Sequence, residues 1–234
     1  MEIIEQNKEK IKFIAETNVS LANAIRRSVS EISTLAIKEV DFYKNDSALY
    51  DEIIAHRLGL IPLKNQKLKQ GELIELKLKK KSKDDNTFVK AGELGEEVVY
   101  PEMPIVLLGK NQEIEFVAKA GIGTGLEHSK FIPGLLYYKH LPKIKINKEG
   151  ESHIELANNY SDVFEFKDKL KVKDATKCEI DNDDLKDFPG VEVSLGKEIV
   201  FNIESWGQID AKNIFNEACK VLKSNLLEVS RALK

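Results

Sequence analysis

At 234 residues, the chain is long enough to form one large domain or two small ones, each able to bury a core. No apolar run approaches the about 18–20 residues of a membrane-spanning helix, and the first five residues lack the basic start of a signal peptide. The formal net charge of -3 excludes the basic surplus typical of a stand-alone nucleic-acid binder. We therefore expect a soluble, cytoplasmic protein with no membrane segment and no direct contact to DNA.

The N-terminal part of the chain predicts a β-hairpin. Residues 3–6 and 10–16 flank a polar break, and the second run alternates Ile11, Phe13 and Ala15 with other residues. Further along, residues 35–42 are rich in residue types that favour a strand.

A helix with one apolar stripe is predicted between these strands. Asn18 and Ser20 are both candidates for its N-cap. The stripe recurs at spacings of four, four and three residues and consists of Leu21, Ile25, Val29 and Ile32. Arg26 and Arg27 lie off this stripe.

The middle of the chain is mostly strand-like, with one predicted helix. Residues 51–59 begin with two acids and end on a glycine suited to a C-cap, which favours a helix over a catalytic carboxylate pair. Residues 72–80 alternate as a strand with one solvent-facing side. Residues 105–108 and 113–120 flank a turn composition, which predicts a second hairpin. Short strands are then expected up to the acidic stretch 173–186, which is predicted to be a loop.

The C-terminal part predicts one strand and a long amphipathic helix. Residues 198–204 alternate apolar and polar side chains, and Trp206 and Gly207 end the strand. Asp210 stands where an N-cap belongs. The stripe that follows repeats at three and four residues and consists of Phe215, Ala218, Leu222, Leu226, Val229 and Leu233.

Two amphipathic helices therefore lie near opposite ends of the chain. A discontinuous domain with an insertion would explain this order; the alternative is that both helices pack only on the chain's own sheet. Burial of the terminal stripe offers on the order of 10 kcal/mol, whereas association costs roughly 4–15 kcal/mol. One helix alone would be a marginal interface, so a permanent complex would need the other helix or sheet edges as well.

No segment carries a strong catalytic pattern. Residues 120–125 are glycine-rich but match neither nucleotide-binding loop pattern, so we interpret them as a loop with positive φ angles. His128 stands next to Ser129, yet adjacent side chains rarely form a nucleophilic pair, and no orienting group is identifiable. The four histidines show no metal-ligand spacing.

The charged and sulfur-containing residues also have plain interpretations. The lysines of residues 77–83 could touch a nucleic-acid backbone, but the acids that follow and the lack of interleaved aromatics favour a solvated strand edge. Cys178 and Cys219 are the only cysteines, far apart and without a C-x-x-C pair, so we expect reduced thiols and no metal site.

Five stretches follow one another in an order known from one protein family. Those in the N-terminal third read NAIRRS from Asn23, LAIKEVDF from Leu35 and DEIIAHRLGLIPL from Asp51. A central stretch from Ile105 reads IVLLGKNQEIEFVAKAGIGTGLEHSKFIPG, and the last, from Ile203, reads IESWGQIDAKNIFNEACKVLKSNL. Together they resemble the alpha-like family of cellular RNA polymerases in its archaeal form. The central stretch resembles the family's insert domain, and the last resembles its closing strand and dimerisation helix.

The resemblance implies an α+β fold and a role in assembly. Residues 1–42 and 196–234 would form a discontinuous dimerisation domain, a sheet with two amphipathic helices, and residues 43–195 a mostly β insert domain. The chain would be a non-catalytic platform of DNA-directed RNA polymerase, which pairs with an L-like small subunit and docks the second-largest subunit. Other small polymerase subunits are possible partners, and nucleotide addition would occur at magnesium held by other chains.

The same resemblance implies roles for two groups of residues. Core and partner contacts would come from Leu21, Ile25, Val29, Phe215, Ala218, Leu222, Leu226 and Val229. Contacts to the large subunit would come from Arg26, Arg27, His128 and Lys130.

The chain departs from many archaeal relatives in one respect. They carry a cysteine-rich element that binds an iron–sulfur cluster, whereas the corresponding region here retains only Cys178. We therefore predict no cofactor and a shortened remnant at residues 173–186, and no appended DNA-binding domain of the kind that bacterial alpha subunits carry. Two other hypotheses stand beside this one: a regulatory module that dimerises with itself on the same fold, and a small hydrolase or transferase that uses His128.

Overall fold

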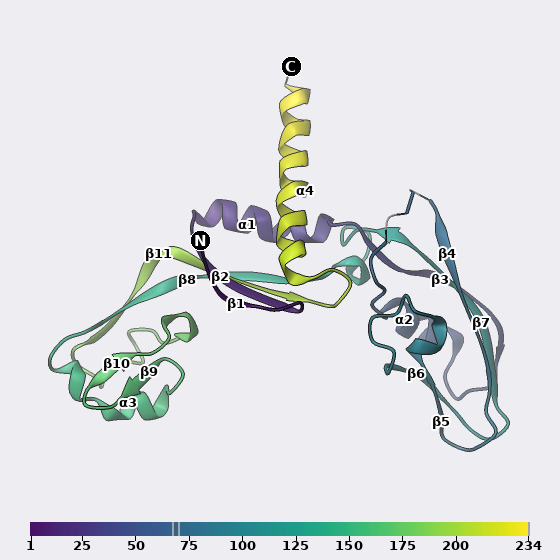
Figure 1. The fold of residues 1–234 in the computed structure, drawn as a ribbon, viewed down its shortest axis with the longest axis horizontal. Helices are drawn as coiled ribbons and strands as arrows, with labels where there is room; N and C mark the ends of the chain where they lie inside the picture. Colours follow the sequence, from purple (N-terminus) through teal and green to yellow (C-terminus); the bar gives the residue numbers. More distant parts are fainter. Residues whose placement is uncertain (67, 70, 234) are drawn as a thin grey trace. The chain divides into compact units, whose positions relative to one another are not determined.

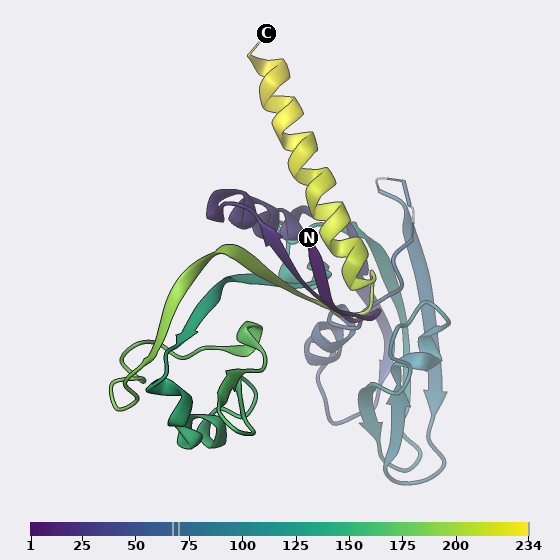
Figure 2. The same ribbon diagram turned by 60° about the vertical axis from the view of Figure 1, so that its left-hand side comes forward.

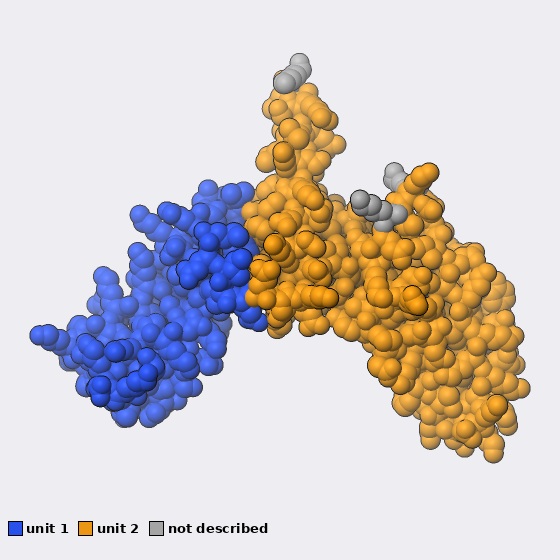
Figure 3. Space-filling model, in the orientation of Figure 1, with its two compact units in different colours: residues 1–5, 12–22, 137–202 blue, residues 6–11, 23–136, 203–234 orange. Residues whose placement is uncertain are grey.

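The computed structural model describes residues 1–66, 68–69 and 71–233. Contacts divide the chain into two compact units, coloured in Figure 3. Unit 1 comprises Met1–Glu5, Lys12–Ala22 and Tyr137–Asn202, and unit 2 comprises Gln6–Ile11, Asn23–Leu136 and Ile203–Lys234. These units are groups of residues with many mutual contacts and are not the predicted domains. The domains formed by residues 1–42 with 196–234 and by residues 43–195 stay a prediction.

A four-stranded sheet combines strands from both ends of the chain. Its order is β1 (Glu2–Gln6), β2 (Lys10–Glu16), β11 (Val191–Ser205) and β8 (Gly134–Ile146). The first two strands form the predicted hairpin, whose turn is closed by the Asn7 N–H donating to the Lys10 carbonyl at 2.8 Å. Because β2 is hydrogen-bonded to β11, segments from the beginning and the end of the sequence share one sheet, as expected.

Unit 1 has a small core of its own beyond the sheet. It is built by the elements η4 (Gly150–Ser152), α3 (Ile154–Asn159), β9 (Phe164–Phe166), β10 (Leu170–Val172) and η5 (Ala175–Lys177). Leu156, Phe164 and Leu170 are buried in this core. Short strands alone were expected here, whereas the chain forms the long strand β8 and a short helix. The loop predicted for residues 173–186 is confirmed, with η5 as its one regular turn.

Unit 2 is built around a second antiparallel sheet. The order of its strands is β3 (Thr34–Asn45), β7 (Glu113–Gly123) and β4 (Leu73–Lys81). The helix α2 (Asp51–Gly59) packs on β3, as the acid-to-glycine pattern predicts, and buries Ile54 and Leu58. A separate pair of strands, β5 (Thr87–Lys90) and β6 (Pro104–Leu108), is linked by a segment that contains η2 (Ala91–Leu94).

The prediction of a second hairpin was wrong. The turn itself forms, since the Gln112 N–H donates to the Gly109 carbonyl at 3.2 Å. The strands on either side of it pair elsewhere, β6 with β5, and β7 with both β3 and β4. The residue types at a turn determine the local bend of the chain. Which strands pair is determined by the arrangement that buries their apolar faces.

The glycine-rich stretch is also not the loop that its composition suggests. Gly121 and Gly123 lie in β7, and neither has a positive φ angle. A Cβ at Gly123 would stand 2.6 Å from the ring of Phe131, which lies in η3 (Ser129–Phe131). These glycines therefore serve close packing in the strand and no nucleotide-binding turn.

Two helices complete the fold. The helix α1 (Val19–Ser28) continues as η1 (Val29–Glu31), and the Asn18 Oδ1 accepts a hydrogen bond from the Leu21 N–H at 2.8 Å, which makes Asn18 the N-cap. The strand β11 ends before Trp206, and Gly207 takes a φ of 95° there. The long helix α4 (Ala211–Ala232) follows and extends beyond the other elements of unit 2 (Figures 1 and 2).

Candidate dimerisation interface

The inner half of α4 packs against other elements of unit 2. Ala211, Ile214 and Ala218 are buried, and the helix packs on η1. The start of the helix is fixed by its backbone, because the Ala211 N–H donates to the Lys8 carbonyl at 2.9 Å. Asp210 is the N-cap residue, although its side chain makes no capping hydrogen bond.

A glycine allows β8 to approach this helix closely. A Cβ on Gly134 would stand 2.9 Å from the Cδ1 of Ile214 and would overlap the carbonyl oxygen of Glu204. A further anchor lies higher on the helix, where the Asn225 Nδ2 donates to the Glu31 Oε2 at 2.8 Å. These contacts attach α4 to the rest of unit 2 from Ala211 as far as Asn225.

The outer half of α4 exposes the continuation of the same apolar stripe. Leu226 is 62% exposed, Val229 58% and Leu233 83%. Nothing among the described residues of unit 2 covers this face (Figures 1 and 2). Large aliphatic side chains gathered on one exposed face typically mark a protein–protein interaction site.

The structure sorts the predicted core and partner residues into three groups. Ile25, Val29 and Ala218 are buried in the chain's own core. Phe215 and Leu222 are half-buried. The exposed members, available to another molecule, are Leu21, Leu226 and Val229.

Sequence periodicity missed two further exposed apolar residues. Val19, at the start of α1, and Leu227, on α4, are both exposed although neither falls on the predicted stripes. Leu227 directly follows a stripe residue, so only its exposure, and no spacing signal, could have identified it.

The two arginines of α1 form a separate surface, which is polar. Arg26 and Arg27 are both exposed, and they line a cavity of about 380 Å³ together with Leu135 and Leu136 of β8. The guanidinium of Arg26 donates to the Asn23 Oδ1 at 2.9 and 3.1 Å, which orients its side chain along the helix.

His128 and Lys130 have structural roles inside unit 2. His128 is the N-cap of η3, because its Nδ1 accepts from the Lys130 N–H at 3.1 Å. The Lys130 Nζ donates to the Ile37 carbonyl at 2.7 Å and lies 5.4 Å from the ring centroid of Phe131. Burial, helped by the nearby charge of Lys38, lowers the pKa of Lys130. The imidazole of His128 thus caps a turn through its Nδ1.

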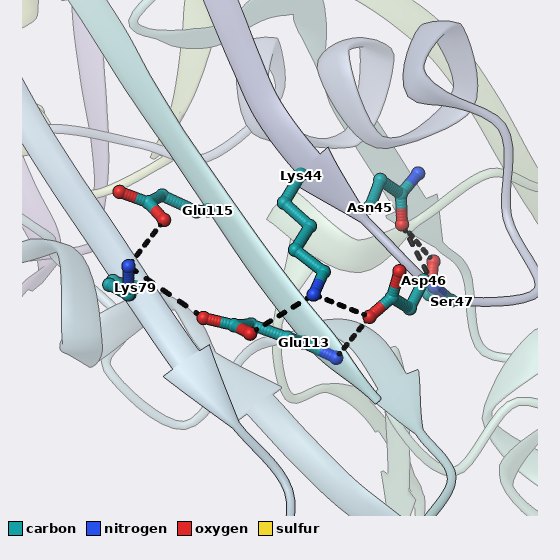
Figure 4. Close-up of polar contacts among 7 residues, drawn as sticks. All are labelled: Lys44, Asn45, Asp46, Ser47, Lys79, Glu113 and Glu115. Carbon is teal, nitrogen blue, oxygen red and sulfur yellow. Dashed lines mark hydrogen bonds and ion pairs between the residues drawn. The ribbon is translucent and has the colours of Figure 1, made fainter. Parts of the chain in front are cut away.

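The lysine run lies on β4, at the edge of the sheet of unit 2, as predicted. Figure 4 shows part of the resulting network: the Lys79 Nζ bridges to Glu115 at 2.6 Å and Glu113 at 3.7 Å, and the Lys44 Nζ bridges to Glu113 at 3.2 Å. The hydrogen bond donated by Lys44 lowers the pKa of Glu113, and the one that Lys79 donates to Glu115 raises the pKa of Lys79. Carboxylates thus compensate much of this positive charge.

The two cysteines are free thiols. Cys178 is buried in the core of unit 1, and Cys219 is half-buried on α4, where burial raises the pKa of its thiol. A raised pKa leaves the thiol protonated at neutral pH, so Cys219 is a packing residue.

An apolar helix face that is buried at its base and exposed along its outer half is typical of a dimerisation module. No helix among the described residues is long and apolar enough to span a membrane. The sequence matches the RNA polymerase Rpb3/Rpb11 dimerisation domain over residues 13–226, and the chain belongs to this family.

Similar proteins support the same assignment over nearly the whole chain. DNA-directed RNA polymerase subunit Rpo3 of Pyrococcus furiosus is 34% identical over 247 residues, covering 95% of this chain and 92% of that protein. The Rpo3 subunit of Thermococcus kodakarensis is 35% identical over 244 residues, covering 94% and 92%. That of Methanothermobacter thermautotrophicus is 31% identical over 249 residues, covering 94% and 93%. The family resemblance inferred from the five stretches is confirmed.

Proposed function

We propose that this chain is a non-catalytic assembly platform of DNA-directed RNA polymerase. In this role it pairs with an L-like small subunit and docks the second-largest subunit, in the cytoplasm and without touching DNA itself. The single observation that carries the proposal is the open apolar face on the outer half of α4. Leu226 and Val229 gain apolar burial only when another chain covers them, and each such burial contributes about 1.5–3 kcal/mol.

The pairing surface is centred on α4. Leu222, Leu226 and Val229 would contact the small subunit there, and the exposed Leu21 of α1 would add a further contact. The buried members of the two stripes, Ile25, Val29 and Ala218, hold the helices on the chain's own core. A permanent complex needs more area than one helix offers, so we expect the small subunit to reach beyond α4.

The arginine surface is the proposed docking place for the large subunit. Arg26 and Arg27 are exposed beside a cavity, where they can meet carboxylates of a partner. The imidazole of His128 caps η3, and the Lys130 ammonium is held by the Ile37 carbonyl, so we expect smaller contributions from both.

We also propose that the chain carries no iron–sulfur cluster. Such clusters are held by about four cysteine thiolates, and the whole sequence has two cysteines, of which only Cys178 lies near the expected region. Purified protein with stoichiometric iron and acid-labile sulfide would contradict this.

Retention on a tagged small subunit of the same organism, after co-expression, tests the pairing. Leu226→Glu places a charge in the proposed contact, and because the side chain is exposed in the free chain, the variant should fold normally. We expect retention to fall at least about tenfold.

The matched control is Leu195→Glu, an exposed leucine on β11 that is not part of the proposed pairing surface, which should be retained like the wild type. Normal retention of Leu226→Glu would contradict the proposed pairing surface. A stable homodimer of the lone chain that gains nothing from the small subunit would favour the self-dimerising regulator instead.

A further inference from the structure

A polar cavity of about 720 Å³ lies at the foot of α4. Its wall is formed by three segments: residues 31–33 at η1, Asn65, and the residues from Gln208 to Val221 that lead into α4. The pairing and docking surfaces described above do not use it.

Three carboxylates line this cavity, those of Glu31, Asp210 and Glu217, and no lysine, arginine or histidine of the described chain does. Glu217 pairs with Lys220 at 2.7 Å, whereas Glu31 and Asp210 have no ion pair among the described residues. Glu31 accepts from the neutral amide of Asn225, and Asp210 makes no capping hydrogen bond. The cavity thus holds a surplus of negative charge.

A buried amide in the same wall has an unused acceptor. Gln208 is only 9% exposed, and its Oε1 has no hydrogen-bond partner among the described residues. The segment is fixed in place because the Asn65 N–H donates to the Gln208 carbonyl at 3.2 Å. A buried acceptor without a donor is costly, so a donor that reaches this oxygen would stabilise the site.

We propose that this acidic cavity receives a basic segment of the small subunit, with a guanidinium or ammonium group that donates to Gln208 Oε1. Lysine and arginine offer only donors, and this matches a wall of carboxylate and amide oxygens. The cavity also flanks the pairing surface on α4, since its lining residue Val221 directly precedes Leu222 and the two side chains point about 100° apart on the helix. The inference rests on the proposed pairing with the small subunit and extends it from an apolar to a charged contact.

The first test removes the charge and keeps the shape. The double variant Asp210→Asn with Glu217→Gln is titrated with the purified small subunit at low and at high salt. We expect its Kd at low salt to rise at least about tenfold, and the salt dependence of its Kd to be flatter than that of the wild type, because fewer charges are paired.

The second test separates binding from stability. Gln208→Met removes the unpaired acceptor, so the Tm of the free chain should stay the same or rise, while the affinity for the small subunit falls. A residue with a purely structural role would show the opposite, a lower Tm and unchanged affinity.

The matched control is Glu228→Gln. Glu228 lies eleven residues beyond Glu217 on nearly the same side of α4 and outside the cavity, so its Kd should stay within about twofold of the wild type. Equal losses for Glu228→Gln and the double variant would overturn the inference in favour of a general charge effect. Unchanged affinity of Gln208→Met would overturn it in favour of an amide satisfied by water.

These outcomes are distinct from a failure of the proposed function. If the wild-type chain does not bind the small subunit at all, pairing itself is wrong. If the wild type binds and all cavity variants bind equally well, only the charged contact is wrong.

Discussion

The two halves of α4 carry one continuous apolar stripe but meet different surroundings. In the inner half, Ile214 and Ala218 are buried against the chain's own core. In the outer half, Leu226 and Val229 continue the helical stripe from Ala218 and are exposed. The comparison teaches that helical periodicity identifies a face to be covered and does not say which molecule covers it.

The largest expected effect is on folding, from a change in the inner half. Ile214→Ala should lower the free energy of unfolding of the isolated chain by about 2–5 kcal/mol, because it empties a fully buried site. Leu226→Ala, in the outer half, should change it by no more than about 0.5 kcal/mol. Denaturant titration of both variants measures the difference. A similar loss of unfolding free energy in both variants would contradict the conclusion that only the inner half of α4 is buried in the free chain.

A smaller effect on folding is expected where the chain packs without spare room. Gly123→Ala would push a methyl group into the ring of Phe131, and overpacking of this kind costs roughly 1–3 kcal/mol. The control is Gly59→Ala at the end of α2, where the new Cβ would meet its nearest atom at 3.8 Å and the change should be neutral or slightly stabilising. Thermal unfolding measures the Tm of both variants. Equal Tm values would show that β7 and the ring of Phe131 shift to accommodate the added methyl group without cost.

The smallest effect is expected from exposed charge. The pKa of Glu113 is lowered in the folded chain, chiefly by the hydrogen bond from Lys44. Its contribution to stability is therefore present above the ordinary glutamate pKa and is lost as the pH falls through the folded-state value. Glu113→Gln should lower the Tm slightly at neutral pH, and the deficit should close under acid.

Glu192→Gln serves as the control for this change. Glu192 is exposed on β11 and has no ion pair among the described residues, so its substitution should leave the Tm unchanged at every pH. A deficit for Glu113→Gln that persists under acid would mean that lost packing, and no charge effect, is responsible.

Much of the fold followed from local patterns in the sequence. The N-terminal hairpin, the acid-to-glycine helix α2 and the long helix α4 are all found where alternation and spacing placed them, and Asn18 is the N-cap out of the two candidates, Asn18 and Ser20. These signals are strong because each depends on residues close together in the chain.

The errors arose where distant segments decide the structure. The turn at residues 109–112 predicted a hairpin, but β7 finds its partners in β3 and β4, far away in the sequence. Gly121 and Gly123 suggested a loop, and only the position of side chains such as Phe131 explains why glycine is needed in a strand. The cavity beside Gln208 gave no signal either, because its wall comes from three separate segments.

Hydrogen–deuterium exchange of the chain, alone and with the small subunit, tests the central claim most directly. Among residues 222–232, all side chains except those of Leu222 and Asn225 are exposed in the free chain, so these backbone amides should exchange quickly. With the small subunit bound, we predict strong protection of these amides and little change in the sheet of β3, β7 and β4. Equal exchange of residues 222–232 with and without the small subunit would contradict the account.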